Sequence, residues 1–196
     1  MLEELKQRVY EANMQLPKHG LVTFTWGNVS EIDRETGYFA IKPSGVDYDK
    51  LKPEDMVIMD LDGNKIEGKY NPSSDTATHI ELYKAFPNIG GIVHTHSNYA
   101  LVMATARKPI PPICDDQVQI LGGDVRVADY TMPGSQEMAK TVVEALKDRT
   151  GALIANHGEI TIGRNLSEAL TGSQVLEKAA MVYINVQSIG GPVQIS

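Results

Sequence analysis

The chain has 196 residues, of which 42% are apolar and 22% are charged, and it carries a formal net charge of −7 at pH 7. This length and composition favour a folded protein with a sizeable core and exclude disordered, collagen-like and coiled-coil proteins. No run of Lys and Arg exceeds two residues and no apolar run approaches ~18 residues, so neither nucleic acid nor a membrane is an expected partner.

The first part of the chain predicts one amphipathic helix followed by antiparallel strands. Apolar residues at helical spacing indicate a helix over residues 2–16 that ends near Pro17. Short β-rich runs follow, and the last of them precedes the hairpin-turn signal Asp62-Gly63-Asn64. The strands are expected at Leu21–Trp26, Tyr38–Ile41 and Met56–Asp60.

The rest of the chain predicts helices alternating with strands. A helix is expected to begin near Ser74, whose hydroxyl is a candidate N-cap, and to end before Pro87. A buried strand over residues 91–96 follows, and Pro109–Pro112 predicts a loop. The other elements are expected as helices over Tyr99–Ala106, Met138–Leu146 and Leu166–Ile189, the last capped by Asn165 or Ser167, and strands over Val125–Val127 and Ala152–Ala155.

These elements predict an α/β fold, with a single-domain α/β/α sandwich whose mixed, largely antiparallel central sheet is covered by helices. No internal repeat and no Gly/Ser linker divides the chain, so we expect one domain over residues 1–196. The residues after Met1 do not form a signal peptide, and the single cysteine, Cys114, has no partner for a disulfide. We therefore expect a cytoplasmic protein in which Cys114 is a partly buried small apolar residue.

Two histidines, His94 and His96, stand at the end of the predicted buried strand. Side chains two residues apart on a strand share a face, so both imidazoles are expected on the same side of the sheet. His157 follows another predicted strand, and Gly158 behind it permits a close approach of backbone. Three imidazoles at strand ends would hold a divalent metal with an open coordination position. The alternative for each histidine is a hydrogen-bonded structural role.

Three turns of small residues are candidates for binding a phosphate group. They lie at residues 26–30, 42–45 and 72–75, and each exposes backbone N–H groups and hydroxyls. None matches a nucleotide-binding motif, and the alternative is that each is only a turn. Lys42 would add a positive charge to such a site, or it would be an ordinary solvated lysine.

Three carboxylates are candidates for acid/base chemistry. Asp75 is expected in the first turn of a helix, where it would ligate the metal, move a proton or only complement the helix dipole. Asp115 and Asp116 adjoin Cys114 in the predicted proline-rich loop, and their alternative is a solvated loop. His19 and His79 are not part of any motif and are assigned structural roles.

Several of these segments, taken in order, resemble the class II sugar-phosphate aldolase and epimerase family, which includes the adducin head. The likeness is dense in the first half, looser in the second, and closest to the L-ribulose-5-phosphate 4-epimerase branch. It rests on the segments at residues 16–19, 25–30, 41–48, 72–76, 90–97, 133–135 and 156–158.

The resemblance implies a metal site, a phosphate site and an assembly. One divalent metal per chain, with Zn²⁺ favoured over Mn²⁺ or Co²⁺, would be held by His94, His96 and His157 with Asp75 beside it. Family members are homotetramers with the site at a subunit boundary, and their shared chemistry is retro-aldol cleavage of a phosphorylated ketose. The substrate phosphate would lie among Gly27, Asn28, Ser44, Gly45, Ser73 and Ser74.

The sequence departs from the family's patterns at three places. Asp75 stands where the aldolases usually have Glu, which favours the epimerases. Gln119 stands nearest the position of the epimerases' acid/base Asp, and an amide cannot exchange the proton. Either Asp115 or Asp116 therefore substitutes for that acid, with Asp116 taken as the catalytic candidate, or epimerisation is lost and a simpler aldolase remains. The sequence ends at Ser196, soon after the predicted final helix, where the epimerases bring a Tyr to the neighbouring site.

These features lead to three hypotheses for function. The first is a metal-dependent L-ribulose-5-phosphate 4-epimerase that forms D-xylulose 5-phosphate, with Asp75 and Asp116 as catalytic residues. The second is an L-fuculose-1-phosphate-type aldolase that releases dihydroxyacetone phosphate and an aldehyde. The third is a non-catalytic module like the adducin head, against which the three histidines argue because a scaffold needs no convergent metal donors.

Overall fold

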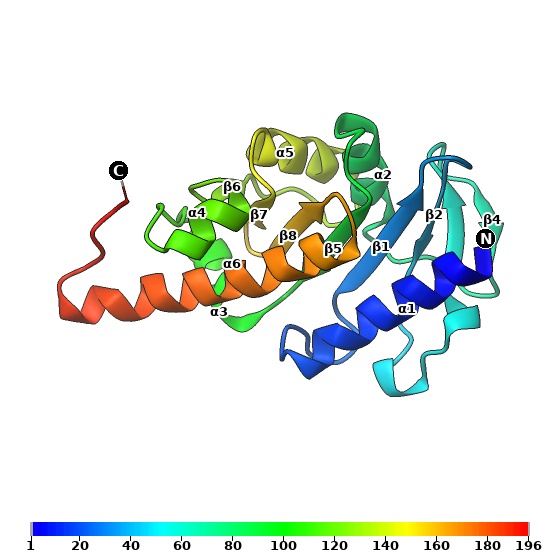
Figure 1. Cartoon of the computed structure of the whole chain (residues 1–196), viewed down its shortest axis with the longest axis horizontal. Coiled ribbons are helices and arrows are strands. Elements are labelled where there is room, and N and C mark those ends of the chain that lie inside the picture. The colour runs from blue at the N-terminus through cyan, green and yellow to red at the C-terminus, as the bar shows by residue number, and fades with distance from the viewer. Residues whose placement is uncertain (1, 196) are drawn as a thin grey trace.

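The computed structural model describes residues 2–195, which build one eight-stranded sheet with helices on both faces (Figure 1). The strand order is β4-β3-β2-β1-β5-β8-β7-β6, and every neighbouring pair is antiparallel except the parallel pair β6 and β7. The predicted α/β/α sandwich with a largely antiparallel sheet is therefore confirmed. The strands are β1 (Asn28–Asp33), β2 (Tyr38–Ile41), β3 (Val57–Asp60), β4 (Lys65–Glu67), β5 (Gly91–Thr95), β6 (Arg126–Ala128), β7 (Gly151–Ile154) and β8 (Gly158–Gly163).

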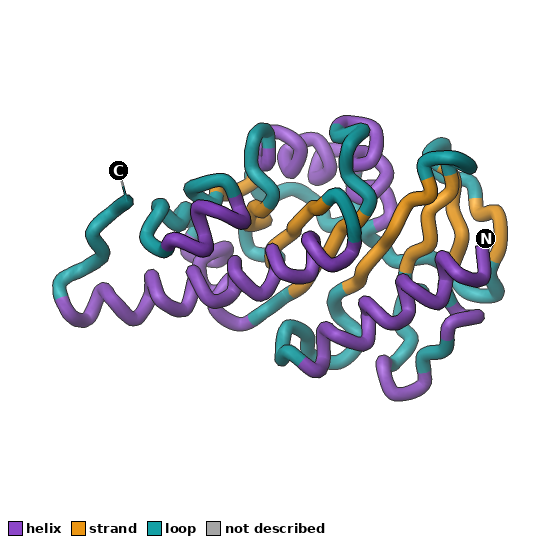
Figure 2. The backbone as a smooth tube through the Cα atoms, viewed as in Figure 1, coloured by secondary structure: helices purple, strands orange, loops and turns teal. Residues whose placement is uncertain are grey.

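Two layers of helices cover the sheet (Figure 2). One core packs α2 and α5 on the face that carries Ile92 of β5. A second core packs α1 on the opposite face, which carries Val93, and a third packs α3, α4 and α6 together beside it. The helices are α1 (Leu2–Lys18), α2 (Thr76–Ala85), α3 (Asn98–Ala106), α4 (Asp115–Leu121), α5 (Gln136–Leu146) and α6 (Leu166–Val186), with 3-10 turns at Tyr48–Lys50, Pro53–Asp55 and Gln187–Ile189.

The first strand lies later in the chain than its sequence predicts. Residues 21–26 are irregular, and β1 begins only at Asn28. The aromatic residues that suggested a strand are exposed instead, at 77% for Phe24 and 53% for Trp26, and Phe24 has a φ of +55° that no strand adopts. The real strand is held from α1, where the Asn13 side chain bonds both the N–H and the C=O of Val29.

Four further elements differ from the predictions. Residues 115–121 form a helix rather than a solvated loop, and Cys114 precedes it, partly buried as expected. Strand β8 was not predicted, and the last helix ends at Val186 before a 3-10 turn. The α2 helix begins at Thr76, and Ser74 is exposed and does not cap it. By contrast, the side chain of Asn165 caps α6 as predicted.

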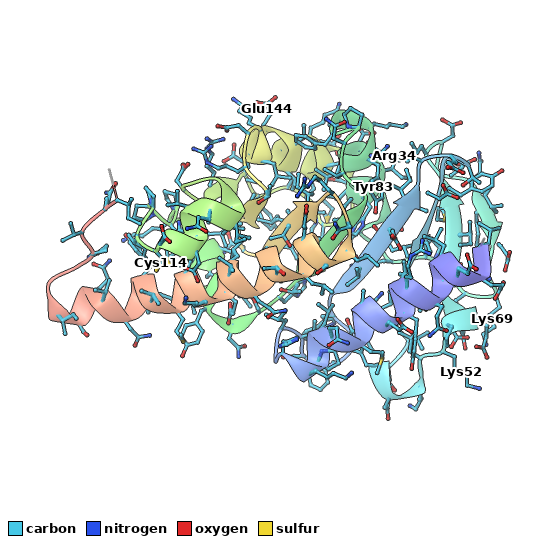
Figure 3. All side chains as sticks on the ribbon, viewed as in Figure 1. Arg34, Lys52, Lys69, Tyr83, Cys114 and Glu144 are labelled. Atoms are coloured by element: carbon cyan, nitrogen blue, oxygen red, sulfur yellow. The ribbon has the colours of Figure 1, made fainter. Side chains whose placement is uncertain are left out.

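None of the helices within residues 2–195 has both the length and the hydropathy of a membrane span. At one end of the sheet, Arg34 lies near Tyr83, and both residues are labelled in Figure 3. The Arg34 guanidinium donates to the carbonyls of Tyr83, Phe86 and Ile89, and so ties the β1–β2 hairpin to the end of α2. This leaves the opposite ends of the strands, where the histidines lie, as the end of the sheet that is open to a ligand.

Candidate metal centre and phosphate cradle

Three histidines converge at the carboxyl end of β5. His94 lies in β5 and His96 directly follows it, while His157 lies in the turn between β7 and β8, of which β8 is the neighbour of β5 in the sheet. Their ring centroids are 4.8–5.0 Å apart, and their candidate ligand atoms all lie within 4.8 Å of one another. The structure thus brings together the three imidazoles that were predicted to converge.

The orientation of the rings suits a divalent cation. The Nδ1–H of His94 donates to the backbone oxygen of Glu159 at 2.7 Å, which leaves the lone pair on Nε2. This Nε2 lies 3.1 Å from Nε2 of His96. Two imidazole nitrogens on a tetrahedral zinc lie about 3.3 Å apart, because each Zn–N bond measures about 2.0–2.1 Å. The spacing therefore fits two ligands of one ion.

Burial keeps the three imidazoles neutral. It lowers the pKa of His96 and of His157 to about 4, and their charges would also repel other histidines of the cluster. The pKa of His94 is lowered as well, mainly because the ring is fully buried. A neutral imidazole is the form that binds a metal, so the three histidines do not need to release protons at pH 7 before they bind a metal ion.

Asp75 lies beside the histidines with its carboxylate already engaged. Its Oδ2 is 3.8 Å from Nε2 of His94 and accepts a hydrogen bond from Nδ2 of Asn28 at 2.9 Å. Burial would raise the pKa of Asp75, but the neighbouring imidazoles, His94 first, and the Asn28 amide outweigh it and hold the pKa below its ordinary value. Asp75 is therefore an ionised carboxylate that lies next to the three histidines.

A cavity of about 350 Å³ opens directly on these residues. His96, His157 and Asp75 line it, together with Thr25, Trp26 and three loops of small residues. All seven predicted phosphate-binding residues contribute to its wall: Gly27, Asn28, Lys42, Ser44, Gly45, Ser73 and Ser74.

The three loops of small residues that line the cavity, at residues 26–30, 42–45 and 72–75, are called the cradle below. They are joined by backbone hydrogen bonds. Ser73 donates its N–H to the carbonyl of Lys42, and Ser44 donates its N–H to the carbonyl of Asn71, so two hydrogen bonds hold the second and third loops together. In the first loop, Gly27 has a φ of +103°, and a Cβ there would lie 2.6 Å from Val22 Cγ1 and 3.1 Å from the carbonyl oxygen of His94. Only glycine fits at this position, which brings the first loop against the histidine strand.

Lys42 is buried rather than solvated, with 1% of its surface exposed. Its ammonium donates to the carbonyls of Thr25 and Pro43 and lies 4.7 Å from the ring centre of Tyr48. Burial lowers the pKa of Lys42 to about 8, and the Asp47 carboxylate partly opposes this shift. At pH 7 the cradle therefore holds a positive charge whose hydrogen bonds also link two of its loops.

The structure separates Asp116 from this cavity. Asp116 lies in the first turn of α4, where its carboxylate pairs with Lys178 of α6, and it is not among the residues that line the cavity. Gln119 lies outside as well, and its amide bonds the carboxylate of Asp115. Within the described residues, Asp75 is the only carboxylate in the cavity wall.

Sequence reasoning missed other residues around the site. Trp26 stacks on His96 with ring centroids 6.2 Å apart, and the Tyr48 hydroxyl donates to the carbonyl of Gly27. An aromatic residue next to a Gly-Asn turn was the available signal for Trp26. His79 is fully buried, and its Nδ1 lies 2.6 Å from the hydroxyl of Ser30, which agrees with the structural role assigned to it.

Comparison with known proteins gives the family. A family model described as Class II Aldolase and Adducin N-terminal domain matches residues 7–184. A solved L-fuculose 1-phosphate aldolase is 35% identical and superposes with a TM-score of 0.94, covering 98% of this chain and 91% of that chain. The L-fuculose-1-phosphate aldolase from Thermus thermophilus is 28% identical, with a TM-score of 0.81 over 96% of this chain and 98% of that chain.

YgbL from Escherichia coli shares the fold, with a TM-score of 0.90 and 24% identity over 100% of this chain and 95% of that chain. The matches and the three-histidine cavity together define the class of protein, a metal-dependent enzyme of the sugar-phosphate aldolase type. The chain belongs to the Class II Aldolase and Adducin N-terminal domain family.

Proposed function

We propose that this enzyme cleaves a ketose 1-phosphate by a retro-aldol reaction, giving dihydroxyacetone phosphate and an aldehyde. The observation that carries the proposal is the contact between the two halves of the cavity. Asn28 bonds Asp75 on the metal side and the hydroxyl of Ser73 on the phosphate side, so the two sites are adjacent. A ketose 1-phosphate carries its phosphate on the carbon next to its carbonyl, so it would reach both adjacent sites at once.

The proposed ligands of the metal are His94, His96 and His157, with Asp75 as a further ligand or as a base. Three imidazoles and one carboxylate favour Zn²⁺, although Mn²⁺ and Co²⁺ accept the same donors. When bound, the divalent cation would supply Lewis-acid polarisation of the ketose carbonyl. The fixed Nδ1–H bond of His94 would keep its Nε2 directed at that ion.

The proposed role of the cradle is to hold the phosphate without a cluster of cations. The chain is acidic overall, so attraction must come from local N–H groups, hydroxyls and the one buried ammonium of Lys42. Ser44 and Gly45 would approach from one side, and Ser73 and Ser74 from the other. Anchoring the phosphate in this way would place the carbonyl carbon toward the histidines and exclude loose binding modes.

Cleavage of the bond between C3 and C4 requires a base for the hydroxyl proton on C4. The electron pair of the broken bond moves toward the carbonyl, and the C4 hydroxyl becomes the aldehyde of the product. Asp75 is the proposed base, because it is ionised and lines the cavity. Returning a proton to C3 then completes dihydroxyacetone phosphate.

Epimerisation of L-ribulose 5-phosphate at C4 is the second candidate function, and one observation favours it. Asp75 stands where the aldolases of the family usually have Glu. The positions of Asp116 and Gln119 weigh against it, because neither lines the cavity and a second acid is needed to protonate the C4 oxygen when the C3–C4 bond re-forms on the opposite face of the aldehyde. We therefore rank cleavage ahead of epimerisation.

A homotetramer with the site at a subunit boundary is part of the proposal, and the cytoplasm is its proposed location. Exposed apolar side chains beside the cavity support the assembly, at 77% for Phe24, 53% for Trp26 and 73% for Met132. Isolated chains rarely leave several large apolar groups in water next to a polar cavity. A neighbouring chain would cover them and would supply groups for the aldehyde.

A product assay on the zinc-loaded protein tests these proposals. L-fuculose 1-phosphate should release dihydroxyacetone phosphate, and L-ribulose 5-phosphate should give no D-xylulose 5-phosphate. The reverse result would reject cleavage in favour of epimerisation, and inactivity on both with one metal bound per chain would reject both. Size-exclusion chromatography with light scattering, run on the same sample, would reject the tetramer if it gave the mass of one chain.

A further inference from the structure

The reverse side of the histidine strand carries a second polar cluster that the proposed reaction does not use. Because residues alternate along β5, Thr95 faces α6 while His94 faces α2. The Thr95 hydroxyl donates to Oε1 of Glu159 at 2.7 Å, and the hydroxyl of Ser173 on α6 donates to the same oxygen at 2.6 Å. Thr95, Glu159 and Ser173 are all fully buried.

Glu177, one turn further along α6, binds Ser97, the residue that follows His96 in the chain. Its Oε2 accepts from the hydroxyl of Ser97 and from the N–H of Ala100, both at 2.8 Å, and its Oε1 accepts from the N–H of Tyr99 at 2.9 Å. These N–H groups belong to the first turn of α3, which begins at Asn98. A carboxylate there also complements the positive end of that helix.

His96 thus lies between two residues that α6 holds in place. Thr95 is fixed through Glu159 and Ser173, and Ser97 is fixed through Glu177. Glu159 acts on the other ligand of this strand as well, because its backbone oxygen accepts the Nδ1–H of His94. The long helix α6, which crosses β5 and β8 (Figure 1), therefore supports the metal centre from the face of the sheet opposite His94, although it contributes no residue to the cavity.

We propose that Glu177 is a positioning residue of the metal centre, which sets the direction of the His96 imidazole through Ser97 while Glu159 holds Thr95. We call these residues, Thr95, Ser97, Glu159, Ser173 and Glu177, the brace. The inference rests on the proposed metal site. It predicts that the brace governs how tightly and in what geometry the histidines hold an ion. Hydrogen bonds made directly to metal ligands typically contribute about 10- to 100-fold in metal affinity, which sets the scale for this effect.

The composition of the brace argues for this role over simple packing. Within the described part of the chain, Oε2 of Glu159 is buried without a hydrogen-bond partner. Burying such an atom is unfavourable, and apolar residues of the same size would fill the space with less loss. The carboxylates are therefore explained by the direction of their hydrogen bonds, which lead to the residues that flank the ligands.

Two variants test the proposal without removing a ligand. Glu177→Gln keeps the shape of the side chain but places an amide against one of the three donors. Ser97→Ala removes only the hydroxyl and leaves both bonds from α3 to Glu177, so the helix keeps its cap. Asn165→Ala is the matched control, because it removes a helix-capping bond at the far end of α6.

Two measurements are made on each metal-free full-length variant. Zn²⁺ affinity is measured by competition with a chromophoric chelator, and the visible absorption spectrum of the Co²⁺ form reports coordination geometry. We expect Zn²⁺ to bind about 10-fold or more weakly in Glu177→Gln and about 3- to 10-fold more weakly in Ser97→Ala, each with an altered Co²⁺ spectrum. In Asn165→Ala the affinity should stay within about twofold of the wild type, whatever its loss of stability.

Unchanged Zn²⁺ affinity and Co²⁺ spectra in both variants would overturn the brace, even if urea unfolding showed lower stability. So would equal losses of affinity in the brace variants and in Asn165→Ala. If the wild-type chain binds no stoichiometric Zn²⁺ or Co²⁺, the proposed metal site fails and the brace fails with it. The first two outcomes leave the metal site standing, so the two failures are distinguishable.

Discussion

The two faces of the sheet differ most where β5 ends. On the α2 face, His94 lies against His96, which lines a cavity whose walls are loops of small residues. On the α6 face, one residue further along the same strand, Thr95 is fully buried and bonded to a carboxyl group. Burial raises the pKa of this group, Glu159, to about 7, against the opposing hydrogen bonds from Ser173 and Thr95.

This difference shows how one strand serves two purposes. The alternation of side chains places ligands on the face that a substrate can reach and their supports on the face that it cannot. The open face is assembled from turns, which can present N–H groups, and the closed face from a strand and a helix, which hold their atoms more firmly. Four experiments test whether the faces are as distinct as this.

Removing a ligand from the open face should have the largest effect. His96→Ala should lose stoichiometric Zn²⁺ and lower kcat/KM by on the order of 1,000-fold or more, because it removes a donor from the proposed ion. Elemental analysis and the cleavage assay measure both. His19→Ala is the control, since His19 is exposed and lies outside the cavity. Cleavage that survives in His96→Ala without bound metal would contradict the metal site.

A methyl group at Gly158 should disturb both faces at once. A Cβ there would lie 2.3 Å from the carbonyl oxygen of Thr95 and 3.0 Å from Cδ2 of His96. Gly158→Ala should therefore lower the free energy of unfolding by about 2–3 kcal/mol and weaken Zn²⁺ binding. The comparison variant is Gly37→Ala, where φ is +75° but no atom lies within 4 Å, so only backbone strain of about 1 kcal/mol is expected. Normal metal binding in Gly158→Ala would show that this contact does not set the histidine geometry.

Lys42 should give the wild type a pH-dependent stability. Its pKa of about 8 in the folded chain lies below its ordinary value, so between about pH 8 and pH 10.5 the unfolded chain binds more protons. Stability from this group should rise with pH across that interval, by up to about 3 kcal/mol. The difference in unfolding free energy between the wild type and Lys42→Met, measured by urea at several pH values, isolates the effect. A difference that does not change with pH would mean that the ammonium is not desolvated.

The smallest effect is expected at the edge of the cradle. Ser44→Ala should raise KM for the phosphorylated substrate and Ki for inorganic phosphate by about 10-fold, the value of one hydrogen bond to a charged group. The kcat should change less than twofold, because the phosphate does not react. Ser188→Ala, at the far end of the chain, is the matched control. A fall in kcat with unchanged KM would place Ser44 with the reacting groups instead.

Periodicity in the sequence predicted much of the fold, and it failed where tertiary contacts override local preference. Strand β2 lies at Tyr38–Ile41 as predicted, because its apolar residues are also its buried residues. Residues 21–26 misled because Phe24 and Trp26 favour strands but lie exposed beside the cavity. Strand β8 alternates small, polar and apolar residues, and its Glu159 and Thr161 are buried with hydrogen-bond partners that α6 and Thr95 of β5 provide.

The candidate site was more predictable than the residues that support it. The two-residue spacing along the strand predicted that His94 and His96 lie on one face, and the turns of small residues predicted the cradle. The brace could not be predicted, because Glu177 and Ser97 are 80 positions apart and nothing local links them. Asp116 looked like an acid near the site until its partner, Lys178, was placed in α6. Contacts between residues so far apart in the sequence can be recognised only when the folded structure is known.

The position of Trp26 gives the protein its own optical reporter. It is the single tryptophan of the chain, it is half exposed at the rim of the cavity, and its indole stacks on the imidazole of His96. Indole emission responds to the polarity and the quenching groups around the ring. Its intensity should therefore follow any event at that imidazole or any subunit that covers the rim, in unlabelled protein and on the timescale of a stopped-flow mixer.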